Sequence, residues 1–352
     1  MHGALPLATE PWYASRDDVM SALDVAETAR THAQIDRLIA AASRSIDSLC
    51  HRKFHPWVGT RYLDWPTEQC ARGGWAWLDA NEVIELTNVV SGGTTIASSD
   101  YFLYPLSGPP FTRLEIDLSS SATLGGGATH QRDLVLTGTF GYGADTATVG
   151  TLAEAVDTAE TSIDLSSSVG VGTLLLVDNE YMHVSGRLLL TTGQTTNGAL
   201  TASKGSTSVA VDDGTLFTLG EVITIDAERM LITDIAANSL IVERAWSGST
   251  LAAHDSGSTV YAPRTAVVER AGCGTAAASH SSGATVYRHV PPALVTSLAV
   301  SEAVWALQNE QSGMARTVGE GEASRQVTQS TIRPLREQVL GIYGRKMRHR
   351  AV

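Results

Sequence analysis

The sequence has few cysteines, no long hydrophobic run and no recognisable export signal. Its three cysteines, Cys50, Cys70 and Cys273, lack the number and spacing of a disulfide framework, which argues against a disulfide-stapled secreted domain. The absence of any run of 18 or more apolar residues argues against a membrane-spanning helix. The N-terminus lacks the basic start and apolar stretch of a signal peptide. We therefore expect a soluble protein made in a reducing cytoplasm.

The sequence is also poor in charge, and its charge is unevenly distributed. Charged residues make up 18% of the chain and the net charge is −12, which argues against a protein whose main role is to bind phosphate groups. Residues 144–290 hold 16 acidic and 7 basic side chains, a net of −9, whereas the other 205 residues hold 21 and 18, a net of −3. The acidity therefore belongs mostly to one block.

Motifs of catalysis and cofactor binding are missing as well. The sequence has no Gly-Lys-Ser/Thr phosphate loop and no Gly-x-Ser-x-Gly nucleophile elbow. The glycine pair Gly170 and Gly172 lacks the third glycine and the acidic residue of a dinucleotide site. We therefore expect neither an enzyme nor a bound cofactor.

Helical periodicity marks the two ends of the chain. Ser15 followed by acidic residues predicts a short helix that runs to about Glu27. A longer helix is predicted over Thr31–His51, because its apolar residues recur at helical spacing. After Pro291-Pro292, a helix is predicted from Leu294 that breaks near Gly313, and a last helix follows Pro334.

Between Trp57 and Gly143 the apolar period becomes two, which predicts short strands. The expected strands are 61–65, 82–86, 100–104, 113–116 and 134–140. We expect them to form a small antiparallel sheet covered by the helices. The expected fold class is therefore α+β, with a helical core and a small antiparallel sheet in residues 1–143 and 291–352, and an all-β inserted domain in residues 144–290.

The inserted segment contains internal repeats. Residues 242–261 recur as residues 268–287, with 12 identities in 20 positions. A looser echo 46–48 residues apart links the segment from Ser162 to Met182 with the segment from Ser208 to Met230. Repeats indicate a strand unit that is used more than once. We expect a sandwich or β-roll with repeats at about 160–205, 206–264 and 265–290.

The order of these segments resembles the head–tail connector (adaptor) proteins of long-tailed bacteriophages. The resemblance covers the chain outside residues 144–290 and depends on pattern and order, without a catalytic motif. In that family the Gly-Tyr segment leads almost directly into the proline-initiated helix, whereas here residues 144–290 separate them. The segments that carry the resemblance are Asp36–Ile46, Tyr101–Pro105, Arg113–Glu115, Val135–Gly143 and Val290–Leu294.

This resemblance implies a structural virion protein made in the host cytoplasm and located in the neck of the particle. The implied assembly is a ring, dodecameric in the family, between the portal protein and a stopper or tail protein, with genomic DNA passing through its lumen. The alternative is a receptor- or carbohydrate-binding virion module, for which the insert offers the aromatic residues Trp246, Tyr261 and Tyr287 as surface contacts.

Two groups of residues are candidates for contacts within such an assembly. Four basic residues close to the C-terminus form a candidate portal-docking tail: Arg345, Lys346, Arg348 and Arg350. Trp75 and Trp77 share one face of a predicted strand and are candidates for an intersubunit contact, because aromatic residues are enriched at interfaces.

The remaining chemistry-bearing residues favour structural roles. Cys50, His51 and His55 lie close together but lack the second ligand pair of a structural zinc site, so we expect no metal. His254 and His280 occupy equivalent repeat positions, which favours a turn-stabilising role over catalysis. The acidic residues at Asp178 and Glu180 are interpreted as solubility residues at a hairpin tip.

Overall fold

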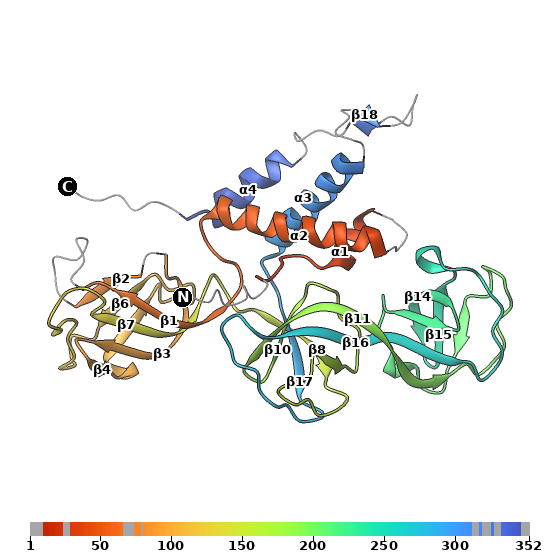
Figure 1. Ribbon diagram of the computed structural model, residues 1–352, viewed down its shortest axis with the longest axis horizontal. Helices are drawn as coiled ribbons and strands as arrows, with labels where there is room; N and C mark the ends of the chain where they lie inside the picture. The colour runs from red at the N-terminus through yellow and green to blue at the C-terminus, as the bar shows by residue number, and fades with distance from the viewer. Residues whose placement is uncertain are drawn as a thin grey trace, which may run out of the picture.

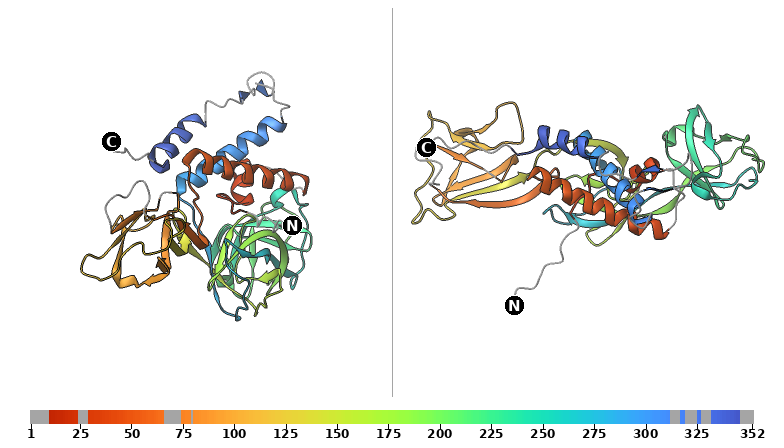
Figure 2. Two further views of the ribbon diagram at one scale, coloured as in Figure 1. Left: turned by 60° about the vertical axis from the view of Figure 1, so that its left-hand side comes forward. Right: turned by 90° about the horizontal axis from the view of Figure 1, so that it is seen from above.

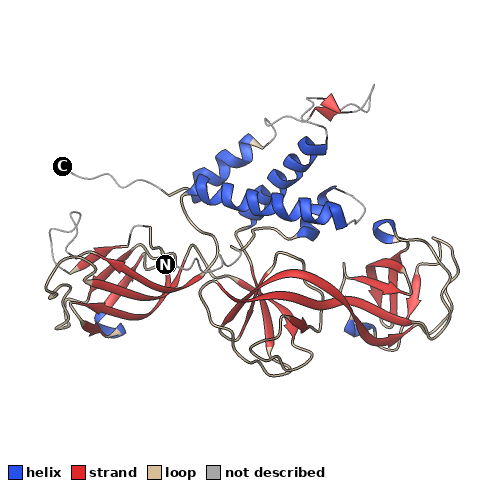
Figure 3. Ribbon diagram, viewed as in Figure 1, coloured by secondary structure: helices blue, strands red, loops and turns tan. Residues whose placement is uncertain are grey.

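The protein is described here by a computed structural model, which covers residues 10–23, 29–65, 74–78, 80–311, 317–318, 325–326 and 332–345. The helices lie together on one side of a row of three β-lobes (Figures 1 and 3). The view from above in Figure 2 shows that the row is elongated. The described helices are α1 (Arg16–Leu23), α2 (Ala29–Cys50), α3 (Ala293–Gln311) and α4 (Arg333–Tyr343).

The four helices form one layer from the two ends of the chain. A capping pair starts α1, because the backbone N–H of Asp18 donates to Ser15 Oγ at 3.2 Å and the Ser15 N–H donates to the Asp18 carboxylate at 2.8 Å. α2 packs against α3, and an Arg37–Glu310 ion pair of 2.7 Å joins them. Their buried apolar residues form one core with α1 and α4. Segments from opposite ends of the sequence therefore share a single helical core.

The first β-lobe has two sheets that enclose a separate core. A four-stranded sheet has the order β1-β7-β3-β4, and a three-stranded sheet has the order β2-β6-β5. Buried residues from both sheets, such as Leu114 and Leu136, pack in one cluster between them. The strands are β1 (Trp57–Leu63), β2 (Trp75–Trp77), β3 (Val83–Ser91), β4 (Thr94–Ile96), β5 (Tyr101–Tyr104), β6 (Arg113–Ile116) and β7 (Leu134–Phe140).

The expected fold class, a helical core with a small sheet, is wrong. Strands make up 38% of the described residues and helices 22%, and the antiparallel sheets are large. The physical reason is that the helices do not cover the sheets of the first lobe. The helices bury their apolar faces against one another, and the two sheets bury theirs against each other. The protein is a mostly β protein with a separate helical layer.

Residues between Thr146 and His289 form a ten-stranded antiparallel sheet. Its order is β12-β15-β14-β13-β16-β11-β10-β17-β8, with β9 paired to β16 off this path. The strands are β8 (Thr146–Thr151), β9 (Ser162–Asp164), β10 (Leu174–Val177), β11 (Glu180–Thr195), β12 (Ser208–Ala210), β13 (Val222–Ile225), β14 (Glu228–Ala236), β15 (Ser239–Glu243), β16 (Thr259–Gly272) and β17 (Thr285–His289). A small hairpin of β18 (Thr317–Val318) and β19 (Arg325–Gln326) follows α3.

This sheet consists of two units of the same topology, each with its own buried core. Unit 1 has the strand order β8-β17-β10-β11-β16-β9, and unit 2 has the order β11-β16-β13-β14-β15-β12. The long strands β11 and β16 serve both units, as a ribbon that runs from one to the other (Figure 1). Unit 2 is therefore inserted into the hairpin between two strands of unit 1.

The repeats seen in the sequence are halves of these nested units. Val177 pairs with Val286 in unit 1, and Ile225 pairs with Val260 in unit 2. Val177 and Ile225 are equivalent positions of the looser echo, whereas Val286 and Val260 are equivalent positions of the shorter repeat. Unit 1 is therefore built from two separate stretches of sequence, and unit 2 from one continuous stretch that lies between them. We had expected three consecutive repeats.

Among the described residues, none of the helices is long and apolar enough to span a membrane.

Candidate functional site

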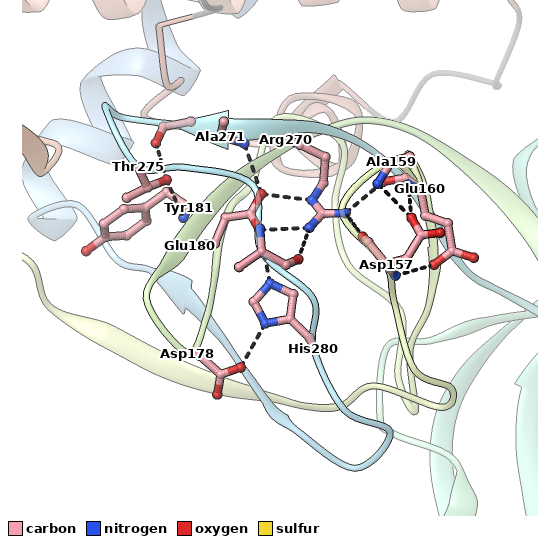
Figure 4. A network of polar contacts seen from close by, with 12 residues as sticks. Asp157, Ala159, Glu160, Asp178, Glu180, Tyr181, Arg270, Ala271, Thr275 and His280 are labelled. Carbon is pink, nitrogen blue, oxygen red and sulfur yellow. Dashed lines mark hydrogen bonds and ion pairs between the residues drawn. The ribbon is translucent and has the colours of Figure 1, made fainter.

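One buried polar network of the insert is centred on Glu180 (Figure 4). The Arg270 guanidinium donates to both carboxylate oxygens of Glu180, each at 2.8 Å. The backbone N–H groups of Ala271 and Ala278 donate to the same carboxylate at 3.0 and 2.9 Å. His280 contacts Glu180 through Nε2 at 3.0 Å. The carboxylate is therefore fully engaged inside the chain.

Unit 2 contains the same network around Glu228. Arg244 donates to Glu228 at 2.7 and 2.8 Å, and His254 Nε2 lies 2.9 Å from its carboxylate. The outer ring nitrogen of each histidine faces an aspartate, at 2.8 Å for Asp178 in unit 1 and at 2.7 Å for Asp226 in unit 2. The side chains of Arg244 and Glu228 are completely buried.

These networks are structural. Each arginine also donates to backbone carbonyls of the loops around it, as Arg270 does to Asp157 and Glu160 at 2.7 and 2.9 Å. A buried, fully satisfied network of this kind fixes one arrangement of the strands and turns. The positions of His254 and His280 in these networks agree with the turn-stabilising role that the sequence predicts. The interpretation of Glu180 as a solubility residue is wrong, because its side chain is 1% exposed.

Acid is expected to weaken both networks. Burial raises the pKa of a carboxyl group, but at Glu228 the hydrogen bonds from Arg244, two backbone N–H groups and His254 outweigh it and lower the pKa from 4.5 to about 2. A carboxyl group with a lowered folded-state pKa contributes stability above about pH 4.5, and this contribution is lost as the pH falls toward 2. We expect denaturant unfolding to show the largest stability gap between the wild type and Glu228→Gln above pH 4.5. A gap that stays constant from pH 6 to pH 2.5 would contradict this expectation.

The two tryptophans singled out in the sequence lie together on the three-stranded sheet. Trp75 and Trp77 have ring centroids 5.2 Å apart in an edge-to-face arrangement. Arg113 on β6 stacks over both rings at 5.7 and 5.6 Å, and over Tyr104 at 4.2 Å. Glu115 pairs with Arg113 at 3.2 Å.

Strand register places a further aromatic residue on the same side of this sheet. Trp75 and Phe102 both pair with Glu115, so the three side chains share one face. Phe102 is 45% exposed. We call this surface the aromatic face, formed by Trp75, Trp77, Phe102, Tyr104 and Arg113. Tryptophan, tyrosine and arginine are the residue types that dominate binding energy at protein interfaces.

The basic tail begins inside the fold. The backbone N–H of Arg345 donates to the Cys50 carbonyl at 3.0 Å, and its guanidinium lies 3.6 Å from the buried Glu82 carboxylate. The hydrogen bond from Arg345 to Cys50 thus joins the end of α4 to the end of α2. Lys346, Arg348 and Arg350 lie outside the described residues.

The aromatic residues proposed for the insert surface do not gather at one place. Tyr261 and Tyr287 occupy equivalent positions in units 2 and 1, and each is 37% exposed. Trp246 lies in the loop after β15 and is partly buried. The structure brings together Trp75 and Trp77, but not these three residues.

Of the cysteine and histidine residues near the end of α2, Cys50 and His55 are buried and His51 is exposed. Burial raises the pKa of the Cys50 thiol and lowers the pKa of His55 to about 4, so that both side chains are neutral at pH 7. In the part of the chain that the structure describes, no three His, Cys, Asp or Glu side chains are placed to hold a metal ion.

The helical layer contains a cleft of about 640 Å³ between α2, α3 and α4. Its wall is mostly apolar, with Leu38, Ala42 and Trp305 among its lining residues. An Arg336–Glu302 ion pair of 2.7 Å lies at its side, and Arg336 also donates to Ser45 at 2.8 Å. This pair is satisfied within the layer and joins α4 to α2 and α3.

No protein-family profile, curated protein or solved structure matches the chain.

Proposed function

We propose that this chain is a head-to-tail adaptor of a tailed bacteriophage. It assembles into a closed ring between the portal and the stopper or tail, and its lumen passes the genomic DNA. The proposal starts from the resemblance of residues 1–143 and 291–352 to the adaptor family. It is supported most by one observation: the segments on the two sides of the insert come together as one helical layer beside one β-lobe.

The junction of the insert strengthens this support. The backbone N–H of Val290 donates to the Asp145 carbonyl at 2.8 Å, so the chain leaves the core and returns to it at one place. His289 lies between the Asp145 and Phe54 carbonyls, at 3.1 and 2.9 Å. Without the insert, the Gly-Tyr segment would continue almost directly into the proline-initiated α3, as it does in the adaptor family.

Charge distribution is also compatible with this role. The segments outside residues 144–290 have a net charge of −3 over 205 residues. A nearly neutral lumen would not hold the DNA backbone, because tight binding to phosphates needs clustered basic residues. The acidic insert keeps copies soluble through like-charge repulsion.

Native mass spectrometry tests the proposal. The chain is measured alone and together with the portal protein of the same phage. Closed assemblies of many copies support the adaptor function. A strictly monomeric chain in both samples rejects it.

The basic tail is expected to contribute to attachment. Because Arg345 is used inside the fold, the informative truncation removes only residues 346–352. We expect weaker binding to the portal protein with an unchanged melting temperature, and weaker salt dependence of the remaining binding, because exposed charge pairs are screened by salt. Portal binding equal to that of the full chain in a pull-down at low salt would exclude the tail as a docking element.

A further inference from the structure

The two units of the insert share a turn that can be compared atom by atom. The Gly172 N–H donates to the Val184 carbonyl at 2.8 Å in unit 1, and the Gly220 N–H donates to the Ile232 carbonyl at 2.9 Å in unit 2. The two glycines have positive φ angles of 94° and 82°. The two turns therefore have the same structure at equivalent positions of the two units.

In unit 1 this turn is covered by the segment that leads into α1. The Arg16 N–H donates to the Val171 carbonyl at 2.9 Å. The Trp12 ring lies directly on Gly172, where an added Cβ would overlap it, and packs edge-to-face on His183 at 5.2 Å. Val171 is 1% exposed and belongs to the buried core of unit 1, against which Trp12 also packs. An aromatic side chain followed by the start of a helix thus fits this turn.

In unit 2 the equivalent turn is open. Leu219, which corresponds to Val171, is 68% exposed, and a Cβ added at Gly220 would meet no atom within 4 Å. Leu231 and Ile235 take the positions of His183 and Arg187. Ile235 packs against the buried core of unit 2. We call the remaining surface the open face, formed by Leu219, Gly220 and Leu231.

The residues at these positions indicate what covers the open face. In unit 1, Arg187 pairs with the acidic Asp17 at the start of α1 at 2.8 Å. In unit 2 the residue equivalent to Arg187 is the apolar Ile235. An acidic side chain could therefore not form there the ion pair that Asp17 forms in unit 1. An aromatic ring with apolar neighbours fits, because burial of apolar area drives such contacts.

A source of such rings lies at the other end of the molecule. The aromatic face on β2, β6 and β5 and the open face of unit 2 lie on the two outermost lobes of the row (Figure 1). The N-terminal Trp12 is already used on unit 1 of its own chain. Joining unlike faces of successive copies gives a head-to-tail interface, and such an interface closes into a ring when the rotation between copies permits.

We propose that the open face of unit 2 receives the aromatic face of a second copy of this chain. This inference rests on the proposed ring function and names the contact that joins neighbouring copies. Phe102 is the most exposed ring of the aromatic face. It packs on Gly220 of the neighbouring copy in the same way as Trp12 packs on Gly172 within one chain. Leu219 packs against it.

Cross-linking between two variants, each with one added cysteine on a Cys70→Ser background, tests the contact; the other native cysteines, Cys50 and Cys273, are buried. Leu219→Cys and Phe102→Cys chains are mixed under mild oxidation, with Leu219→Cys plus Tyr287→Cys as the matched control, since Tyr287 is exposed on unit 1 outside both faces. We expect a disulfide-linked dimer from the first mixture only. Leu219→Ser and Phe102→Ala are each expected to weaken association between copies by about tenfold or more, whereas Tyr287→Ser leaves it unchanged.

The outcomes separate this inference from the adaptor function. Rings that form equally well with Leu219→Ser and Phe102→Ala, and that give no specific cross-link, overturn the proposed contact and leave the adaptor function intact. A monomeric wild-type chain, alone and with the portal protein, overturns both. Binding of a different protein to the open face without a link between copies also overturns the proposed contact.

Discussion

Replacing Glu180 with alanine is expected to lower the free energy of unfolding of unit 1 by about 3–5 kcal/mol, because it leaves a buried arginine without its partner. The carboxylate receives two hydrogen bonds from Arg270, two from backbone N–H groups and a contact from His280. Water cannot replace these interactions, since the Arg270 side chain is 7% exposed and the Glu180 side chain 1%. Denaturant unfolding with hydrogen exchange measures the loss and locates it in the sequence.

Two matched variants make this measurement specific. Glu228→Ala removes the equivalent carboxylate of unit 2, and we expect a loss of similar size that is confined to that unit. Asp178→Ala removes only the exposed carboxylate on the far side of His280, and we expect it to cost less than about 1 kcal/mol. If Glu180→Ala and Asp178→Ala had equal effects, the buried network would not be the structural centre of the unit.

The second large effect is expected at the turn beneath the N-terminal segment. Gly172→Ala places a methyl group into the Trp12 ring at a backbone conformation with a φ of 94°. Backbone strain and overpacking each cost about 1–3 kcal/mol, so the two together are expected to destabilise the protein by about 2–6 kcal/mol. Trp12 must move, and the contact between the helical layer and unit 1 must loosen.

Gly220→Ala is the matched control, because the same turn in unit 2 has no atom in the way. In an unassembled chain it carries the backbone strain alone, which amounts to about 1–3 kcal/mol, so the two variants are compared as single copies. Thermal unfolding and hydrogen exchange of α1 distinguish the two variants. Equal destabilisation by both, with unchanged exchange in α1, would contradict the docking of Trp12 on unit 1.

Local periodicity was sufficient to predict the helices and five strands of the first β-lobe. The helix predicted over Thr31–His51 is α2, and the strands predicted at 113–116 and 134–140 are β6 and β7. Such elements depend on residues close in sequence, where the spacing of apolar side chains is visible. Fold class depends on which apolar face packs against which, and that information is not local. Our prediction that helices cover the sheet was wrong for this reason.

The buried networks show a second limit. The shorter repeat contains the arginine and the histidine, and the looser echo contains Asp178 and Glu180 with their counterparts. Each half was visible in the sequence, but the link between them is made by the nesting of unit 2 within unit 1. Because the partners Glu180 and Arg270 are 90 residues apart, neither repeat alone indicates that the carboxylate is buried. One repeat contains an arginine and the other contains a glutamate. This complementary charge in two repeats is the signal that could have revealed the pairing.

Electron microscopy of the purified chain tests the adaptor function most directly. We expect closed rings with a central opening, both for the full chain and in complexes with the portal protein. A variant in which a short linker replaces residues 146–289 separates the roles of core and insert, because the chain leaves and rejoins the core at Asp145 and Val290. Because this variant also lacks the open face of unit 2, we expect it to lose the link between neighbouring copies and to stay attached only through the portal protein, without the density of the insert. Only single copies, for the full chain alone and with the portal protein, would contradict the account.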